Sequence, residues 1–528
     1  MNVMQSREIA LGELENKTWD VVIIGGGITG AGILRESVRR GLNAVLVEQE
    51  DFSWGTSSRS TKMVHGGMRY LKQGNIGLTR ESVIERENLI REIPGLVEDR
   101  TFIMPYYKGN VLQRLMLQTG LVVYNLLSGK WRKNRCSLSD MAKRAPLVKS
   151  SDLKGGFLIN DAVTDDSRLV LRVLHEALKQ GARAINYCKA ETLLKNEHAT
   201  CGVRVRDTVS GNDYNIQAKL VINATGAWAD TLRQQIRKKN DKHIRPLRGS
   251  HIILSAKRLP LFDNISLMHP EDGRPVITLT WEGRILMGTT DIDHQDGLST
   301  EASISKKEVK YLLDALNFQF PEAKITEKDV ISTMAGIRPV IDTGKSDPSK
   351  ESRDHVIWLE DGLLTVTGGK LTTFRVIALD TLDKAQKILG NLPDLKQMQN
   401  VFDEKVDWNT NHFRHLPNNS VKRLFGRYGN RAKELIGLSS DENLQTIPDT
   451  ETLWAEIEWA ATNEMVVHLD DLMLRRTRIG LLLENGGTEY LPKIRQLCQK
   501  ILGWTDQTWE EEENRYLNIW KNHYSLPN

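Results

Sequence analysis

The sequence of 528 residues predicts an α/β fold in which a parallel sheet is interrupted by an inserted antiparallel sheet and followed by a helical C-terminal domain. Three observations lead to this prediction. A strand, a glycine turn, a helix and a second strand follow one another near the N-terminus, short β-rich segments lie between Arg245 and Asp291, and helical patterns rich in Trp, Glu and Arg begin near Phe402. A chain of this length exceeds one compact core, so two or three domains are expected.

The composition is that of a folded, soluble-type chain. Hydrophobic residues make up 40% and charged residues 27%, and the net charge of +4 gives nucleic-acid binding no support. The cysteines are widely spaced and lack metal-ligand spacing, so they are expected to be reduced thiols, with no metal site (Cys136, Cys188, Cys201 and Cys498). Neither a secretory signal nor a spanning segment is recognisable, which predicts a cytoplasmic protein with surface attachment to a membrane left open.

The first βαβ unit is readable from local patterns. Asp20 to Ile24 (DVVII) is an apolar, β-branched run typical of a strand buried on both faces. A helix is expected from about Thr29 to Arg40, and a second strand from Asn43 to Val47. Further along, DDSRLVLRVLHEALKQGA predicts a capped amphipathic helix and KLVINATG another buried strand, so the same sheet is expected to continue there.

Gly25, Gly27 and Gly30 form a G-x-G-x-x-G motif between the first strand and the first helix. Gly25 permits the tight turn, Gly27 lets the backbone approach a pyrophosphate, and Gly30 allows close helix-to-strand packing. The N–H groups at the helix start favour negative charge. Glu48, at the end of the second strand, can accept hydrogen bonds from both hydroxyls of an adenosine ribose. The motif therefore predicts a bound dinucleotide, either FAD or NAD.

Two later segments favour FAD. The polar, glycine-rich loop SSRSTKMVHGG (57–67) offers hydroxyl, ammonium and backbone N–H groups to a pyrophosphate and a flavin ring. The element NATG (223–226) resembles the second nucleotide contact of glutathione-reductase-like flavoproteins. Together they predict a glutathione-reductase-like, Rossmann-type FAD-binding domain.

With these motifs assembled, the chain resembles the aerobic, FAD-dependent glycerol-3-phosphate dehydrogenase family over nearly its full length. The matching segments are IGGGITGAG (24–32), GTSSRSTKMVHGGMRYL (55–71), NATGAW (223–228), GSHI (249–252), GTTD (288–291), AGIRPV (335–340), GGKLTTFR (368–375) and LDDLMLRRTRIG (469–480). The chain departs from the family's usual residues at Leu34, Glu36 and Phe374, so a paralogue with a shifted substrate preference stays open.

The patterns and the resemblance together divide the chain into an oxidoreductase region, 18–392, and a C-terminal helical domain, 400–528. FAD-binding parts are expected at about 18–75, 155–240 and 330–392, and substrate or cap parts at about 76–154 and 241–329. The residues expected to bind FAD are Gly25, Gly27, Ile28, Thr29, Gly30, Glu48, Ser57, Ser58, Ser60, Thr61, Lys62, His65, Gly66, Thr225, Gly226, Gly369, Lys370 and Leu371.

The resemblance implies oxidation of sn-glycerol 3-phosphate to dihydroxyacetone phosphate, with a hydride passing from C2 to the flavin N5 and electrons then passing to a membrane quinone. It implies His251 as the base, because a neutral imidazole can take a proton near pH 7, although a structural histidine beside the inserted sheet is the alternative. It also implies a catalytic Arg338 within a cationic set that suits a phosphate dianion. The expected substrate-binding residues are Arg69, Tyr70, Thr290, Arg338, Arg353 and Lys370.

The segment RLMLQTGLVVYNLLSGKWRKNR (114–135) has an apolar helical body and a basic, aromatic end. This pattern suits a peripheral contact with an anionic membrane, and equally a core helix whose charged end complements its dipole. The expected partners are sn-glycerol 3-phosphate, a quinone, the membrane surface and a second copy of the chain in a homodimer. Three alternatives stay open: a glycerol-3-phosphate oxidase using O2, a related FAD oxidoreductase of amino or 2-hydroxy acids, and a flavin-binding regulatory protein without turnover.

Overall fold

The computed structural model describes residues 7–68, 71, 74–109, 111–129, 133–197, 199–237, 243–344, 351, 354–394, 400–407, 413 and 416–527. Among these residues, eight strands form a first sheet with a parallel core in the order β18, β10, β1, β2 and β7. Its strands are β1 (Trp19–Ile24), β2 (Ala44–Val47), β7 (Arg183–Ile185), β8 (Cys188–Lys195), β9 (Thr200–Asp207), β10 (Asp213–Asn223), β17 (His355–Glu360) and β18 (Leu363–Gly368).

Strand β1 is buried on both faces, as its continuous apolar run predicts. Val21 and Ile23 pack into the cluster formed with the helices α2 (Ile28–Arg39), α7 (Asp166–Lys179) and α10 (Phe374–Leu389). The alternate residues Val22 and Ile24 pack on the other face against the meander β8 to β10 and the short helices α1 (Arg7–Glu13) and α8 (Ala229–Arg233). The first sheet is therefore a covered middle layer, and its helices and meander hold the strand ends in place.

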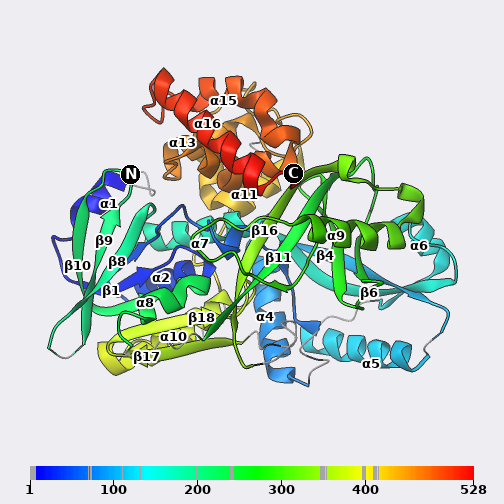
Figure 1. Cartoon of the computed structure of the whole chain (residues 1–528), viewed down its shortest axis with the longest axis horizontal. Coiled ribbons are helices and arrows are strands. Elements are labelled where there is room, and N and C mark those ends of the chain that lie inside the picture. Colours follow the sequence, from blue (N-terminus) through cyan, green and yellow to red (C-terminus); the bar gives the residue numbers. More distant parts are fainter. Residues whose placement is uncertain are drawn as a thin grey trace.

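A second, mostly antiparallel sheet lies beside the first in Figure 1. Within the described part of the chain it has ten strands: β3 (Met63–Val64), β4 (Val97–Tyr107), β5 (Arg135–Cys136), β6 (Leu153–Thr164), β11 (Ile244–Ser255), β12 (Asn264–Met268), β13 (Pro275–Trp281), β14 (Arg284–Gly288), β15 (Ile292–Asp293) and β16 (Val330–Ile341). Its surrounding helices are α4 (Ile76–Glu92), α5 (Val111–Ser128), α6 (Leu138–Arg144) and α9 (Lys306–Gln319).

The C-terminal region is helical and sits above the junction of the two sheets (Figure 1). Its helices are α11 (Asn418–Tyr428), α12 (Ala432–Leu438), α13 (Trp454–Asn463), α14 (Ile479–Leu482), α15 (Leu491–Cys498) and α16 (Asp506–His523), with a π-helical turn over Asp471–Arg476. This region does not build its core alone, because Ile457, Leu472 and Tyr516 share one hydrophobic cluster with Ile253 and Leu286 of the second sheet.

The predicted fold class is confirmed. The predicted elements of the first βαβ unit match β1, α2 and β2 to within one residue at each end. The second sheet is larger than the window 245–291 implied, since β4, β6 and β16 also belong to it. Their main partners lie far away in the sequence, β16 pairing with β11 for example, and local periodicity carries no information about such pairing. The segment 330–341, placed with the FAD-binding parts on sequence grounds, therefore runs in the second sheet.

Candidate active site

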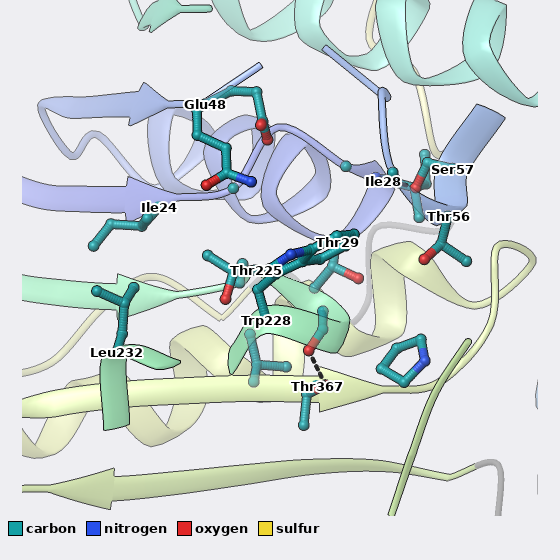
Figure 2. Close-up of a pocket in the computed structure, with 18 of the residues that line it drawn as sticks. Ile24, Ile28, Thr29, Glu48, Thr56, Ser57, Thr225, Trp228, Leu232 and Thr367 are labelled. Atoms are coloured by element: carbon teal, nitrogen blue, oxygen red, sulfur yellow. Dashed lines mark hydrogen bonds between the residues drawn. The ribbon is translucent and has the colours of Figure 1, made fainter. Parts of the chain in front are cut away.

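A cavity of about 550 Å³ opens where β1, β2, β10 and β18 end. Open parallel sheets bind ligands at the carboxyl ends of their strands, and this cavity lies in that position. Figure 2 shows Glu48 at one end of the cavity, Ser57 and Thr56 at the other, and Thr225, Trp228 and Thr367 along one side. The cavity is elongated between these groups, which suits a ligand with several linked polar parts.

The glycine turn supplies the floor of the cavity. Gly25 has a φ of +116°, and a Cβ on Gly30 would come within 1.9 Å of the Gly25 carbonyl oxygen. A Cβ on Gly27 would lie 3.1 Å from the hydroxyl of Ser57, in the space that faces the cavity. The first two positions thus require glycine for the turn and for packing, whereas Gly27 keeps the backbone accessible to a ligand.

The N-terminus of α2 points into the same space. Gly27 precedes the helix without a capping side chain, and the N–H of Ile28 donates to Ser57 Oγ at 3.0 Å. N–H groups in the first turn of a helix have no acceptor within the helix and attract negatively charged groups, and the helix dipole adds to the attraction. The geometry therefore suits a pyrophosphate beside Gly27, Ile28 and Ser57.

Glu48 lies at one end of the cavity (Figure 2). Its Oε2 accepts from the N–H of Gly26 at 2.6 Å and its Oε1 from the N–H of Glu50 at 2.9 Å. Burial raises the pKa of Glu48 to about 7, although these backbone hydrogen bonds oppose the change. A carboxylate held in this way retains lone pairs that can accept hydrogen bonds from ribose hydroxyls.

Most of the residues expected to bind FAD line this cavity: Gly25, Gly27, Ile28, Thr29, Glu48, Ser57, Ser60, Thr225, Gly226, Gly369, Lys370 and Leu371. The structure also brings in residues that the sequence analysis missed. Thr367 and Gly368 precede the predicted Gly369 directly, so the GGK motif was a signal for them. Lys189, Ala190 and Glu191 on β8 carried no motif, because only the folding of the meander brings them to the cavity.

Other expected FAD contacts are engaged elsewhere. The Lys62 ammonium is fully buried, donates to both oxygens of Asp166 at 2.7 and 2.9 Å, and also donates to the Ser58 carbonyl oxygen at 2.6 Å. Burial lowers the pKa of Lys62 to about 8, with Asp166 acting in the opposite direction. Lys62 therefore supports the loop from behind and does not line the cavity.

The remaining members of that set also lie off the cavity lining. The N–H of Gly66 donates to Asp161, and a Cβ at Gly66 would collide with the hydroxyl of Tyr124. The His65 carbonyl oxygen accepts from Thr372, and Ser58 is buried. Gly30 allows α2 to pack closely against the glycine turn. The hydroxyl of Thr61 contacts His251.

His251 lies on β11 in the second sheet and is buried, with 1% of its surface exposed. Its Nε2 lies 3.0 Å from the hydroxyl of Thr61, which belongs to the loop after β2. Burial, reinforced by the positive charges of Arg338 and Lys62, holds the pKa of His251 well below its ordinary value. The imidazole is therefore neutral at physiological pH, which is the protonation state required of a general base.

Arg338 reaches across the second sheet from β16. Its guanidinium donates to Asp291 at 2.8 Å and to the hydroxyl of Thr289 at 3.0 Å. A Cβ on Gly249, in the neighbouring strand β11, would come within 2.6 Å of Arg338 Nη2. A Cβ on Gly288 would come within 2.1 Å of the His251 ring. Strand glycines thus provide the space in which the side chains of His251 and Arg338 lie.

The other expected substrate residues divide into three groups. Lys370 lines the cavity, and its ammonium donates to Ser82 Oγ at 3.2 Å. Thr290 is buried, its hydroxyl donating to Glu308 at 2.7 Å and accepting from the N–H of Ser250 at 2.9 Å, so this hydroxyl stabilises the sheet. Arg69, Tyr70 and Arg353 lie outside the described residues.

Comparisons with known proteins place this geometry among flavoenzymes. The family model for FAD dependent oxidoreductases matches residues 20–375, and the model for the C-terminal domain of alpha-glycerophosphate oxidase matches residues 385–509. The aerobic glycerol-3-phosphate dehydrogenase of Staphylococcus haemolyticus is 33% identical, over 97% of this chain and 96% of the relative. The enzyme of the same name from Staphylococcus aureus strain USA300 is 35% identical, over 89% of this chain and 88% of the relative.

Two solved structures share the fold of this chain. The glycerol-3-phosphate dehydrogenase from Bacillus halodurans, complexed with FAD, has a TM-score of 0.78 at 27% identity and covers 99% of this chain and 97% of its own. The L-alpha-glycerophosphate oxidase from Mycoplasma pneumoniae, with a TM-score of 0.57 at 17% identity, covers 72% of this chain and 98% of its own and shows the shared fold alone.

Proposed function

Because this chain belongs to the FAD-dependent oxidoreductase family together with the aerobic glycerol-3-phosphate dehydrogenases, we propose that it oxidises sn-glycerol 3-phosphate to dihydroxyacetone phosphate. The observation that carries the proposal is the pairing of a neutral, buried His251 with a loop hydroxyl beside the nucleotide cavity, and with Arg338 on the same sheet. A base and a guanidinium so placed suit oxidation of an alcohol that carries an anionic group.

The residues of the cavity fit FAD. Gly27 leaves open the space that a Cβ would fill, the N-terminus of α2 suits the pyrophosphate, and Glu48 suits the adenosine ribose. Gly369 and Leu371, at the other side of the cavity, are proposed to contact the flavin half of the cofactor. Bound FAD supplies the acceptor for the hydride that leaves C2 of the substrate.

His251 is proposed to accept the proton of the C2 hydroxyl. We assign this step to Nε2, the ring nitrogen that faces a hydroxyl group, that of Thr61, in the structure. His251 would take up this proton, and the hydride from C2 would pass to FAD bound in the cavity, so that a carbonyl is left at C2. Since the ring is neutral before the step, its base form is fully available near pH 7.

Arg338 is proposed to bind the substrate and to stabilise its negative charge, with Lys370 as a second cation. The guanidinium is oriented by Asp291 and Thr289 and has a side-chain exposure of 22%, so it can donate a further hydrogen bond. Arg69, Tyr70 and Arg353 stay predictions for the same role.

A quinone at a membrane surface is the proposed electron acceptor, and helix α5 supports this part of the proposal. Its exposed apolar side chains follow one helical face, Leu115 at 60%, Met116 at 66%, Val122 at 39% and Leu126 at 65% exposure. Figure 1 places α5 at the outer edge of the molecule, away from the C-terminal helices. An apolar face of this kind can dip into a membrane interface on its cytoplasmic side. No helix among the described residues has the length and apolarity needed to cross a membrane.

Membrane contact is tested by sedimentation with anionic vesicles at low and high salt. The double variant Leu115→Ser/Leu126→Ser is expected to reduce the bound fraction severalfold. Leu438→Ser, which removes another exposed leucine on α12, is the matched control and should bind like the unchanged protein. Equal binding of both variants would refute the role of α5. The homodimer expected from the sequence is a separate prediction. The molar mass of the holoenzyme, measured by sedimentation in the absence of vesicles, tests it.

The proposed reaction is tested by the visible spectrum of the anaerobic holoenzyme before and after addition of sn-glycerol 3-phosphate. Loss of the flavin absorbance supports the substrate assignment, and an unchanged yellow protein refutes it. Bleaching by an amino acid or a 2-hydroxy acid instead would favour the second candidate, a related oxidoreductase with a carboxylate in the cationic site. Oxygen consumption without added quinone would identify an oxidase.

A further inference from the structure

Three arginines of the C-terminal region are buried beneath the nucleotide-binding loops. Arg475, Arg476 and Arg478 belong to the motif LDDLMLRRTRIG, and their side chains are 2%, 0% and 1% exposed. None of the three lines the nucleotide cavity. Burial of three guanidinium groups is costly unless each has hydrogen-bonded partners, so their partners indicate what the segment holds.

Arg478 connects the C-terminal region to the start of α7 and to the loop 55–62, here called the cofactor loop. Its Nε donates to Asp165 Oδ1 at 3.0 Å, its Nη2 donates to Asp166, and its Nη1 lies 3.3 Å from the Ser58 carbonyl oxygen. Arg478 itself has a left-handed backbone, with a φ of +64°, which a residue with a Cβ adopts at a cost. In this backbone conformation the side chain of Arg478 extends toward the cofactor loop.

Asp166, which accepts from Arg478, also binds the part of the cofactor loop that faces the cavity. Its Oδ2 accepts from both the N–H and the hydroxyl of Ser60, at 2.9 and 2.7 Å. Ser60 lines the nucleotide cavity, together with Ser57 and Thr56 of the same loop. One buried carboxylate thus joins Arg478 on the outside to the wall of the cavity, with Lys62 as its second cation.

The neighbouring arginines hold the other nucleotide loop in the same manner. Asp51, which is fully buried, accepts from Arg475 Nε at 2.6 Å and from Arg476 at 2.6 and 2.8 Å. Asp51 follows Glu48 by three positions, and the N–H of Ser53 donates back to the Gly26 carbonyl oxygen of the glycine turn. The segment 475–478 therefore binds Asp51, near the proposed ribose end of the cavity, and Asp166, which holds the loop at the proposed pyrophosphate end.

We propose that Arg478 is a positioning residue for FAD, and that one task of the C-terminal helical region is to fix the cofactor loop through Asp166. The guanidinium of Arg478 reaches Asp165, Asp166 and the Ser58 carbonyl through three different nitrogens in one plane, and an ammonium at the end of a lysine chain does not reproduce this spread of donors. The proposal concerns retention of the cofactor and does not depend on which substrate is oxidised.

The test compares Arg478→Lys with Arg168→Lys. Both changes keep the charge and remove a guanidinium buried between the same two regions. Arg168 instead pairs with Glu464 at 2.7 and 2.8 Å and does not contact the cofactor loop in any hydrogen bond of the described chain. We expect Arg478→Lys to release FAD from the diluted holoenzyme about tenfold faster, with a changed visible circular dichroism of the flavin, and Arg168→Lys to stay within about twofold of the parent. Both are expected to lower the melting temperature of the apoprotein to a similar extent.

Equal acceleration of FAD release by the two variants, or none by Arg478→Lys, would overturn the proposal. A second variant, Arg478→Met/Asp165→Asn, separates positioning from charge balance, because it removes one cation and one anion while an amide oxygen can still cap α7. It is expected to regain apoprotein stability relative to Arg478→Met while still releasing FAD rapidly. Recovery of both properties together would show that Arg478 only balances buried charge.

Discussion

The nucleotide cavity and the His251 site use opposite means to present polar groups. At the nucleotide cavity the backbone of the glycine turn and the N–H groups at the start of α2 face the space proposed for the cofactor. On the second sheet side chains present the chemistry, and glycines only provide the space for them: Gly288 lies opposite His251, and Gly249 lies beneath Arg338. At the nucleotide cavity a substitution is poorly tolerated, because one backbone group cannot move without its neighbours in the turn. On the second sheet a substitution is better tolerated, because individual side chains can shift.

This difference yields a ranking of expected effects. A Cβ added at Gly25 or Gly30 meets backbone atoms, so the glycine turn must move as a whole. A Cβ added in the second sheet meets the end of a side chain and disturbs catalysis more than folding. A change of protonation at Glu48 moves no atom of the backbone and should have the smallest effect.

Gly30→Ala is expected to have the largest effect. The new Cβ would lie 1.9 Å from the Gly25 carbonyl oxygen, so α2 must move away from the turn. An overpacking cost of about 3 kcal/mol corresponds to FAD binding weakened about hundredfold, measured by titration of the apoprotein with FAD. Gly437→Ala, at a position with no atom within 4 Å of the new Cβ, is the control and should bind FAD normally. Normal FAD affinity in Gly30→Ala would contradict the assigned packing role.

The cavity was the part most open to prediction from sequence. Gly25, Gly27 and Glu48 are linked by a short βαβ unit, so their spacing in the chain fixes their placement in space. The cofactor loop was found as a motif, but the sequence did not distinguish its two sides. Ser57 and Ser60 line the cavity while Lys62 points to Asp166, a partner 104 positions away that no local pattern identifies.

Gly249→Ala is expected to lower kcat/KM for sn-glycerol 3-phosphate about thirtyfold while FAD content stays unchanged. The added methyl group would displace Arg338 from Asp291 and Thr289, and misplacement of a substrate-binding group by about 1 Å has effects of this size. The double variant Gly249→Ala/Arg338→Ala should be no less active than Arg338→Ala alone, since both changes act through one side chain. Independent, additive losses would show that Gly249 acts in another way.

Sequence reasoning was weaker for the second sheet and the C-terminal region because their contacts are long-range. His251 and Arg338 were named from a resemblance, and the pairing of β11 with β16 that brings them onto one sheet had no sequence signal. Thr290 illustrates the opposite case: its motif suggested a substrate contact, whereas burial directs its hydroxyl to Glu308. The motif around Arg478 carries no local signal for its role, since its partners Asp165 and Asp166 lie more than 300 positions earlier.

The mildest test of the cavity is the protonation of Glu48. Burial raises its pKa from the ordinary 4.5 to about 7, so the folded apoprotein holds this proton more tightly than the unfolded chain does. The contribution of Glu48 to apoprotein stability therefore falls as the pH rises from 4.5 through 7. Under the proposed binding of the adenosine ribose by Glu48, FAD affinity should change in the opposite direction, because a carboxylate accepts hydrogen bonds from hydroxyl groups better than the protonated acid does.

We expect FAD to bind about fivefold more tightly at pH 8 than at pH 6, measured by calorimetric titration of the apoprotein at both values. Glu48→Gln, which cannot ionise, should bind with intermediate affinity and without this pH dependence. If Glu48→Gln kept the full pH dependence, another titrating group would be responsible, and the protonation of Glu48 would not control how tightly the cavity binds FAD.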